Sequence, residues 1–408
     1  MSTSLLSVPA RAWKALVAAQ LGWMLDAMDF LLFTFALRAI QKEFGLSSAS
    51  MGLLTSVSLI ASGLGGILFG RLADRIGRVT AMSVSILCYS LATGGLAFSQ
   101  TVAQLVFWRV LVGLGMGGEW SCGSVLVAES WPDEHRAKAM AMMQSAWAVG
   151  ALAAAGLSAL VLEPYGWRRL FLIGATPALL AFFVRRGVEE PDLWQRSERG
   201  AATFGPMFRS PLLRRTVIAS LVSSCVLIAY WGIISWLPTF LATSAGNGGA
   251  GLSVTKSARW LILLQLGALA GYLSFGWFAD RFGRRPSFTL FMIGAAIVVP
   301  VYAFAANDVR VLLLVGPLVG FFAHGYFSVF GALLAELFPT AIRGTAQGFC
   351  YNIGRLASAA SPFLIGAAID AGGFRLALAS TALFFAAAGI LIWFLPETRG
   401  TSLSAIEN

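Results

Sequence analysis

The sequence predicts an all-α membrane protein in which twelve transmembrane helices form two pseudo-symmetric bundles of six. Composition, the number of long apolar segments and an internal repeat lead to this fold class. Of the 408 residues, 58% are hydrophobic and 12% are charged, and the mean hydropathy is +0.77. A soluble domain carries about 25% charged residues. The chain therefore has too few charged side chains to cover a surface that faces water.

Apolar segments of about 20 residues, the length that crosses a bilayer, occur twelve times along the chain. The longest polar interval, 186–213, follows the sixth of them. We therefore expect an N-terminal six-helix bundle (1–185), a cytoplasmic linker (186–213) and a C-terminal six-helix bundle (214–408). The expected helices span 14–38, 49–70, 79–98, 102–130, 137–161, 167–185, 214–241, 255–279, 286–305, 309–336, 343–370 and 374–395.

The placement of basic residues predicts the orientation of the chain. Most of the 29 lysines and arginines fall in loops on the side that carries both termini, and such loops face the cytoplasm. The net charge of +10 is therefore a topology signal, and the scatter of the basic residues argues against a nucleic-acid partner. The first apolar segment is long enough to stay in the membrane, so we expect no cleavable signal peptide. Short loops then indicate a bacterial inner membrane.

The two halves of the chain repeat each other. The stretch GRLADRIGR (70–78) recurs as GWFADRFGRR (276–285), and ESWPDEHRAKA (129–139) recurs as ELFPTAIRGTA (336–346). Both motifs recur at nearly the same offset, and EEPD (189–192) and PETRG (396–400) close the two halves. The chain is therefore a duplicated six-helix unit.

The repeated loop motif predicts a gate at the cytoplasmic face. Asp74 can meet helix ends or the guanidinium groups of nearby arginines, and such a cluster would latch neighbouring helices in one conformation. The alternative is a solvated acid in a positively charged loop. Duplication favours the latch, which we expect to act as a gate and not as a substrate site. The gating residues are Asp74, Arg75, Arg78, Glu129, Arg136, Asp280, Arg281, Arg284, Glu336 and Arg343.

A glycine-rich stretch, GLGMGG (113–118), fits the dinucleotide-binding pattern G-x-G-x-x-G. That pattern requires a preceding strand and a following helix start, whereas this stretch lies within an expected membrane helix. Small residues at this spacing allow helices to approach closely in a membrane. We therefore predict helix packing here and in GILFG (66–70), and no nucleotide site. The four cysteines lie in apolar segments without disulfide or metal spacing.

These motifs carry a family resemblance that covers essentially the whole chain. GRLADRIGR and its echo resemble the signature of the major facilitator superfamily. Within it, LDAMDF, RVLVGLGMGGEW, ELFPTAIRGTAQGFCYNIGR and LPETRG resemble the metabolite:proton symporters. Those include sialate, aromatic-acid, nicotinate and short monocarboxylate carriers. The resemblance implies a secondary transporter, and monomers are usual in the family.

Two aspartates lie in the middle of the first expected helix. A carboxylate at the bilayer centre costs about 2.5–3.5 kcal/mol and usually serves a function. Asp26 and Asp29 are three residues apart and share a helix face, and Arg109 on the fourth helix lies at a depth similar to that of Asp29. We expect an Asp29–Arg109 pair that protonation would release, a pattern that the resemblance to sugar-porter-like symporters also implies. Asp26 and Glu119 lack an evident cation and are further proton sites, or else form structural hydrogen bonds.

One intramembrane arginine stands without an acid at its depth in the C-terminal half. The guanidinium of Arg355 matches a planar carboxylate, so we expect it to bind the substrate. The alternative is a pair with Asp26 or Asp29. A lone aromatic side chain is more often core than ligand contact, and His324 is by default a core histidine, with a proton relay as the alternative. The expected neighbours of Arg355 are Asn352, Tyr351, Tyr326, Gln144, Trp147, Tyr230 and Trp231.

The function predicted from these residues is proton-coupled import of an organic monocarboxylate by alternating access. Protons are the expected coupling ion, and we expect no cofactor and no metal. The partners are then a small anionic substrate and the lipid bilayer. An exporter or antiporter of amphipathic compounds is the alternative within transport, with Arg355 then structural. A receptor would usually need an added cytoplasmic domain, and an enzyme would need a nucleophile–base pair that the sequence does not suggest.

Overall fold

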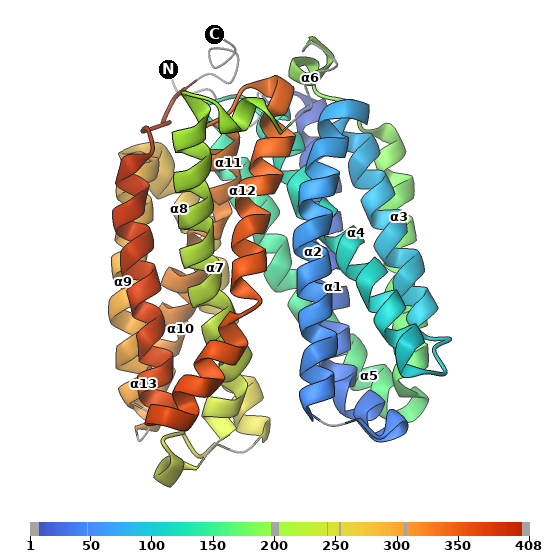
Figure 1. Cartoon of the computed structure of the whole chain (residues 1–408), viewed down its shortest axis with the longest axis vertical. Coiled ribbons are helices and arrows are strands. Elements are labelled where there is room, and N and C mark those ends of the chain that lie inside the picture. Colours follow the sequence, from blue (N-terminus) through green and yellow to red (C-terminus); the bar gives the residue numbers. More distant parts are fainter. Residues whose placement is uncertain are drawn as a thin grey trace.

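The computed structural model describes residues 8–46, 48–196, 204–242, 244–252, 254–305 and 308–401, and all its regular elements are helices. They form two bundles side by side, with α1–α5 in one and α7–α13 in the other, and both chain ends lie at the same end of the molecule, which we call the terminal face (Figure 1). Ten helices in the described part are long and apolar enough to cross a membrane. The long helices are α1 Ala10–Phe44, α2 Ser48–Ile76, α3 Arg78–Leu96, α4 Val102–Ser130, α5 Arg136–Val184, α7 Leu212–Ala242, α8 Val254–Phe282, α9 Arg284–Phe304, α10 Val309–Gly325, α11 Phe327–Ala335, α12 Arg343–Ser358 and α13 Ser361–Leu391.

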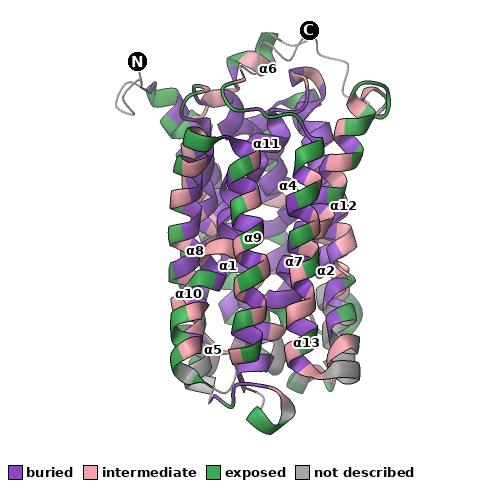
Figure 2. Cartoon of the chain, turned by 90° about the vertical axis from the view of Figure 1, so that its left-hand side faces the viewer, coloured by how far each residue is buried: buried purple, intermediate pink, exposed green. Residues whose placement is uncertain are grey.

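The outer surface of the bundles is apolar. Figure 2 shows exposed and half-buried positions along the outer helix faces and buried positions towards the middle. Large apolar side chains are among the exposed ones, with Leu314 74%, Leu160 73% and Leu383 72% accessible. Such a surface would be an aggregation hazard in water. In lipid it is required, because helices satisfy their backbone groups internally and can present apolar side chains outwards.

Two glycines let the chain turn back between the two successive helices that make up each of α5 and α13. Gly166 within α5 and Gly373 within α13 have non-helical backbone angles, with φ of 78° and 80°. Only glycine adopts such angles without strain. The turns separate the expected spans 137–161 from 167–185 and 343–370 from 374–395, and they occupy equivalent places in the repeat.

The tenth and eleventh expected helices are broken, and the sequence did not predict this. The segment 309–336 turns at one residue, Tyr326, between α10 and α11, where the backbone angles stay helical (φ −62°, ψ −24°), and the segment 343–370 is interrupted after Ser358. Proline near the start of α13 (Pro362) cannot continue the hydrogen bonds of a preceding helix. Discontinuous helices are typical of transporter binding sites, and the second break leaves Arg355 in the last turn of α12.

Glycines bring the two bundles together. The halves meet along α2 against α12 and along α5 against α8. A Cβ at Gly70 would lie 2.5 Å from the backbone oxygen of Gly344 across this interface. Within the N-terminal half, a Cβ at Gly113 would lie 2.5 Å from the Ser58 oxygen. The packing predicted for GILFG and GLGMGG is therefore confirmed.

The closing motifs of the two halves cap helices. Glu190 of EEPD accepts hydrogen bonds from the backbone N–H groups that begin α3, at 2.6 Å from Arg78. Glu397 of PETRG does the same for α9, at 2.8 Å from Arg284 N. A carboxylate suits the positive end of the helix dipole. Each half therefore folds its last segment back onto its own loop motif.

Candidate functional site

A network of buried ion pairs closes the terminal face between the two halves. Glu129 of α4 accepts two hydrogen bonds of 3.0 Å from Arg78 and one of 2.6 Å from Arg343 of α12. All three side chains are fully buried. Because Arg343 belongs to the other half, this contact spans the interface. Removing one member of such a buried pair costs about 3–5 kcal/mol.

The repeat supplies a second, mirrored pair. Glu336 binds Arg284 of its own half at 3.1 Å and Arg136 of the N-terminal half at 3.0 Å. The hydroxyl of Thr398 also donates to Glu336, at 2.6 Å. Two acids and four arginines of the expected gate therefore connect the halves in a reciprocal pattern.

Asp74 strengthens this latch, whereas its repeat equivalent does not. Asp74 accepts hydrogen bonds from Gly344 N at 3.0 Å and from the backbone and hydroxyl of Thr345 at 2.6 Å each. Asp280 contacts Arg284 of its own half at 2.9 Å, and one of its oxygens has no partner in the described part of the chain. Asp280, which we expected in the gate, therefore binds within its own half.

Two arginines of the expected gate lie outside the network. Arg75 is exposed at the end of α2. Arg281 is also exposed, and its guanidinium lies 5.4 Å from the ring centre of Trp277 on the same helix. Both follow their aspartate by one residue and so point away from the interface. The helical periodicity of the motif could have excluded these two arginines from the predicted gate.

Asp29 and Arg109 do not form the expected ion pair. Asp29 accepts a hydrogen bond of 2.7 Å from Thr93 of α3. The guanidinium of Arg109 lies 3.7 Å from the ring centre of Phe33, one turn along α1 from Asp29, and its nitrogens have no hydrogen-bond partner among the described residues. Both side chains are buried, at 3% and 1% exposure. The prediction of a direct pair is wrong for this conformation, in which a cation–π contact takes its place.

Glu119 has a cation after all. Arg185, at the end of the N-terminal bundle, binds it at 2.7 Å, and both side chains are buried. The same guanidinium nitrogen donates to the Ala18 backbone oxygen. Glu119 is therefore not an unpaired carboxylate as predicted. The pair was not predicted because Arg185 is far from Glu119 in the sequence.

A small cavity between the halves, which we call the polar cavity after the two charged residues in its lining, brings Asp26 and Arg355 together. It measures about 20 Å³, room for about one water molecule. Asp26 comes from α1 and is 2% exposed, and Arg355 comes from α12 and is 7% exposed. Nη1 of Arg355 donates a 2.6 Å hydrogen bond to Ser62 of α2. The cavity lining consists of Asp26, Phe30, Ser58, Leu59, Ser62, Met116, Trp147, Trp231 and Arg355.

An aromatic cavity of similar size adjoins the polar one. The two share Trp147, Trp231 and Arg355. Tyr351 stacks on Trp120 with ring centres 3.6 Å apart, and Trp120 donates to Gln144 at 3.4 Å. The aromatic cavity is lined by Trp23, Gln144, Trp147, Leu227, Tyr230, Trp231, Tyr272, Phe327, Tyr351 and Arg355. Five of the seven expected neighbours of Arg355 therefore lie here.

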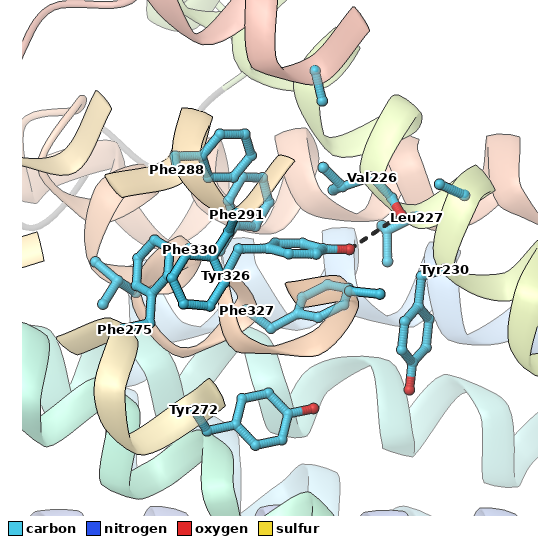
Figure 3. Close-up of a cluster of buried hydrophobic side chains, with 14 of the residues drawn as sticks. Val226, Leu227, Tyr230, Tyr272, Phe275, Phe288, Phe291, Tyr326, Phe327 and Phe330 are labelled. Atoms are coloured by element: carbon cyan, nitrogen blue, oxygen red, sulfur yellow. Dashed lines mark hydrogen bonds between the residues drawn. The ribbon is translucent and has the colours of Figure 1, made fainter. Parts of the chain in front are cut away.

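Two expected binding residues lie elsewhere. Asn352 donates to Ser121 at 3.2 Å across the interface and lines neither cavity. Tyr326 is fully buried in a cluster of aromatic rings, and its hydroxyl donates to the Val226 oxygen at 3.3 Å (Figure 3). Both were assigned from their depth alone. Depth fixes the position along a helix but not the face on which a side chain points.

His324 packs against two tyrosines of the aromatic cavity and does not itself line that cavity. Its ring centre is 5.0 Å from that of Tyr230 and 6.3 Å from that of Tyr272, and both tyrosines line the aromatic cavity. Sequence reasoning missed Tyr272, Phe327 and Trp23, together with the serines of α2. An apolar or small residue in a membrane helix gives no signal of which face it occupies.

Comparison with known proteins identifies the family. The family model of the Major Facilitator Superfamily matches residues 20–257 and 250–407. A Haemophilus influenzae protein assigned to metabolite transport is 37% identical, covering 97% of this chain and 99% of its own. The niacin transporter NiaP of Acinetobacter baylyi is 30% identical (95% and 94% covered). The cis,cis-muconate transport protein of the same organism is 31% identical (88% of each chain covered).

The architecture agrees with solved transporters. The proton:xylose symporter XylE superposes with a TM-score of 0.83 at 21% identity, covering 98% of this chain and 99% of that one. At that identity the likeness concerns the fold alone. The relatives are transporters and not enzymes. The chain is a multi-pass membrane protein that belongs to the Major Facilitator Superfamily.

Proposed function

We propose that this protein is a proton-coupled symporter that imports an organic monocarboxylate by alternating access. The observation that carries the proposal is the pair of opposite charges in the polar cavity, with Asp26 on one half and Arg355 on the other. A guanidinium binds a carboxylate through two parallel hydrogen bonds. The Nε of Arg355 has no partner among the described residues and remains for a ligand.

The adjoining aromatic cavity supports a ring-bearing or otherwise apolar acid. Trp147 and Trp231 line both cavities, so a carboxylate at Arg355 would place the rest of its molecule among aromatic side chains. The niacin transporter among the relatives is named for such an acid. Each cavity holds only about 20 Å³, whereas ligand sites are usually several hundred Å³. Binding therefore requires the far ends of the two halves to separate.

Proton coupling is assigned to the buried carboxylates of the N-terminal half. Asp26 and Asp29 each have an oxygen without a partner in the described part of the chain. In the same part of the chain, the guanidinium of Arg109 lies against the Phe33 ring and forms no hydrogen bond. Charges that are neither paired nor solvated are costly, so the two carboxylates are poised to take up protons as their neighbours move, whereas Arg109 stays charged. We place both termini in the cytoplasm of a bacterial cell with the protein a monomer in the inner membrane.

The aromatic lining also favours a second function, the export of amphipathic compounds in exchange for protons. In that case Arg355 would be structural and held by Ser62. Replacing Arg355 with lysine separates the two functions, because lysine keeps the charge but cannot form the two parallel hydrogen bonds. Anion uptake should then collapse, whereas efflux of neutral or cationic compounds should survive.

The decisive experiment uses purified protein in liposomes that contain a pH dye. Nicotinate, benzoate, N-acetylneuraminate and the dicarboxylate cis,cis-muconate are added outside in turn, and acidification of the lumen is recorded. Symport predicts acidification with one of the monocarboxylates, its loss in Arg355→Lys, and its survival in Arg310→Lys, an exposed control at the start of α10. Empty liposomes measure passive leak of the acids. A signal no larger than that leak would refute the proposal.

A further inference from the structure

Asp26 and Arg355 face the same cavity from opposite halves without touching. Both line the polar cavity, yet no ion pair within 4.0 Å joins them among the described residues. Oδ1 of Asp26 and Nε of Arg355 both lack a partner in the same part of the chain. Each charge therefore lies within electrostatic reach of the other, across a cavity with room for about one water molecule.

The other charged and titratable groups near Asp26 leave Arg355 as its counter-ion. Glu119 of α4 is neutralised by Arg185 at 2.7 Å. Asp29, one turn along α1, is held by Thr93 of α3. The remaining groups that act on Asp26 are Arg355 and Tyr351 of α12 and Tyr89 of α3. Of these, only Arg355 is a cation without an acid of its own.

We infer that Asp26 and the carboxylate of the substrate compete for Arg355, so that one proton settles on Asp26 for each anion bound. This inference rests on the proposed symport function. When the substrate carboxylate forms its hydrogen bonds to the guanidinium, Asp26 loses its counter-ion. A buried carboxylate without a cation is costly, and a proton from the bulk then forms its O–H bond to Asp26. The net charge of the cavity is unchanged, because one anion and one proton have entered together.

The competition assigns different roles to the two aspartates. Asp29 does not line either cavity and is tied to Thr93, so the proton that accompanies binding does not belong to it. Asp26 sets the stoichiometry of one proton per anion. Transport of a monocarboxylate is then electroneutral.

Calorimetric titration of the full chain in nanodiscs with nicotinate tests this directly. Repeating the titration in buffers of different ionisation enthalpy counts the protons taken up. The wild type should take up about one proton per nicotinate at pH 8, and its affinity should fall about tenfold per pH unit, as linkage to one proton requires. Asp26→Asn should take up none and bind independently of pH. Asp29→Asn should still take up one. A pH-dependent Asp26→Asn variant would overturn the inference.

A second measurement needs no substrate and so separates failure of this inference from failure of the proposed function. The infrared carbonyl band of protonated Asp26 is identified by its loss in Asp26→Asn, and its titration midpoint is followed. Arg355→Gln should raise the midpoint by about 1–3 pH units, the effect of an opposite charge nearby, and Arg310→Gln should leave it in place. An unmoved midpoint in Arg355→Gln overturns the competition, whatever the liposomes show. Because the calorimetric titration does not use Arg355→Gln, misfolding of that variant leaves the calorimetric titration decisive.

Discussion

The aspartate of the repeated loop motif should stabilise closure of the terminal face in the first half of the chain (Asp74) and not in the second (Asp280). Asp74 accepts three hydrogen bonds from Gly344 and Thr345 across the interface, whereas Asp280 binds Arg284 of its own half. The two positions are equivalent in the repeat and so provide a matched pair of Asp→Asn variants. Asparagine keeps the size but replaces one acceptor oxygen with an NH₂ group that faces an N–H donor.

The magnitude follows from the contacts that are lost. A hydrogen bond to a charged group contributes about 1.5–3 kcal/mol, and three of them join Asp74 to the other half. Asparagine retains one acceptor, so we take a net loss of about 3 kcal/mol for the closed terminal face, a factor of about 150. A state ratio of about 1:99 for open to closed would become about 3:2. Asp280→Asn should leave the ratio within about threefold.

Distances between spin labels report this equilibrium. Arg75 and Arg281 are exposed at the ends of α2 and α8, so labelled cysteines there, in a background without the native cysteines, follow separation of the halves. Asp74→Asn should add a long-distance population that the wild type and Asp280→Asn lack. Equal distance distributions in the two variants would refute the assignment of the latch to Asp74.

Three further predictions concern packing and charge. Gly70→Ala places a Cβ 2.5 Å from a backbone oxygen of α12 and should open the terminal face in the same spin-label assay, whereas Gly156→Ala, with nothing within 4 Å of its Cβ, should not. Glu119→Gln leaves the buried guanidinium of Arg185 without its acid and should lower the free energy of unfolding by about 3–5 kcal/mol, seen as a lower midpoint of thermal unfolding. Adding Arg185→Met should restore much of that lost stability. A double variant no more stable than Glu119→Gln would contradict the pairing. Glu43 is exposed, and although its slight burial acts to raise its pKa, hydrogen bonds from Arg168 and Trp167 of α5 lower the pKa overall. Its stabilisation is therefore present above the unfolded pKa of about 4.3 and is lost as the pH falls through the lowered value. Because the pair is exposed, Glu43→Gln should cost less than about 1 kcal/mol at pH 7 and nothing at pH 2; a larger cost at pH 2 would refute the sign.

The fold was predictable because membrane helices can be recognised in a sequence by the length and hydropathy of their apolar segments. The repeat then identified the equivalent positions of the two halves, and charges in short loops identified the gating residues, although not the arginine–glutamate pairs that they form. The helix breaks at Tyr326 and after Ser358 were not predictable from hydropathy. The apolar character of the chain continues through both breaks, and only the proline that follows the second one hints at it.

The site was predictable in its charges and less so in its contacts. Asp26 and Arg355 stand out because charge is rare in a membrane segment, and the structure brings them to one cavity. Helix rotation decides whether a neutral side chain lines that cavity, and a helix apolar on all sides carries no periodic signal of its rotation. This is why Tyr326 was included and Tyr272 was missed. Arg185 was missed because its partner, Glu119, lies far away in sequence.

Under the proposed function, the hydrogen bond between Arg355 and Ser62 would connect ligand binding to movement of the halves. It spans the interface at the polar cavity, 2.6 Å long, and uses Nη1, which a carboxylate bound through both terminal guanidinium nitrogens would also use. An anion that takes this nitrogen removes a contact between α2 and α12 at the same moment as it fills the cavity. The latch at the terminal face lies on those same two helices, at Asp74 and Thr345. Under the proposed function, binding in the middle and closure at the end would therefore act on one helix pair, and an occupied cavity would weaken the interface that the latch holds.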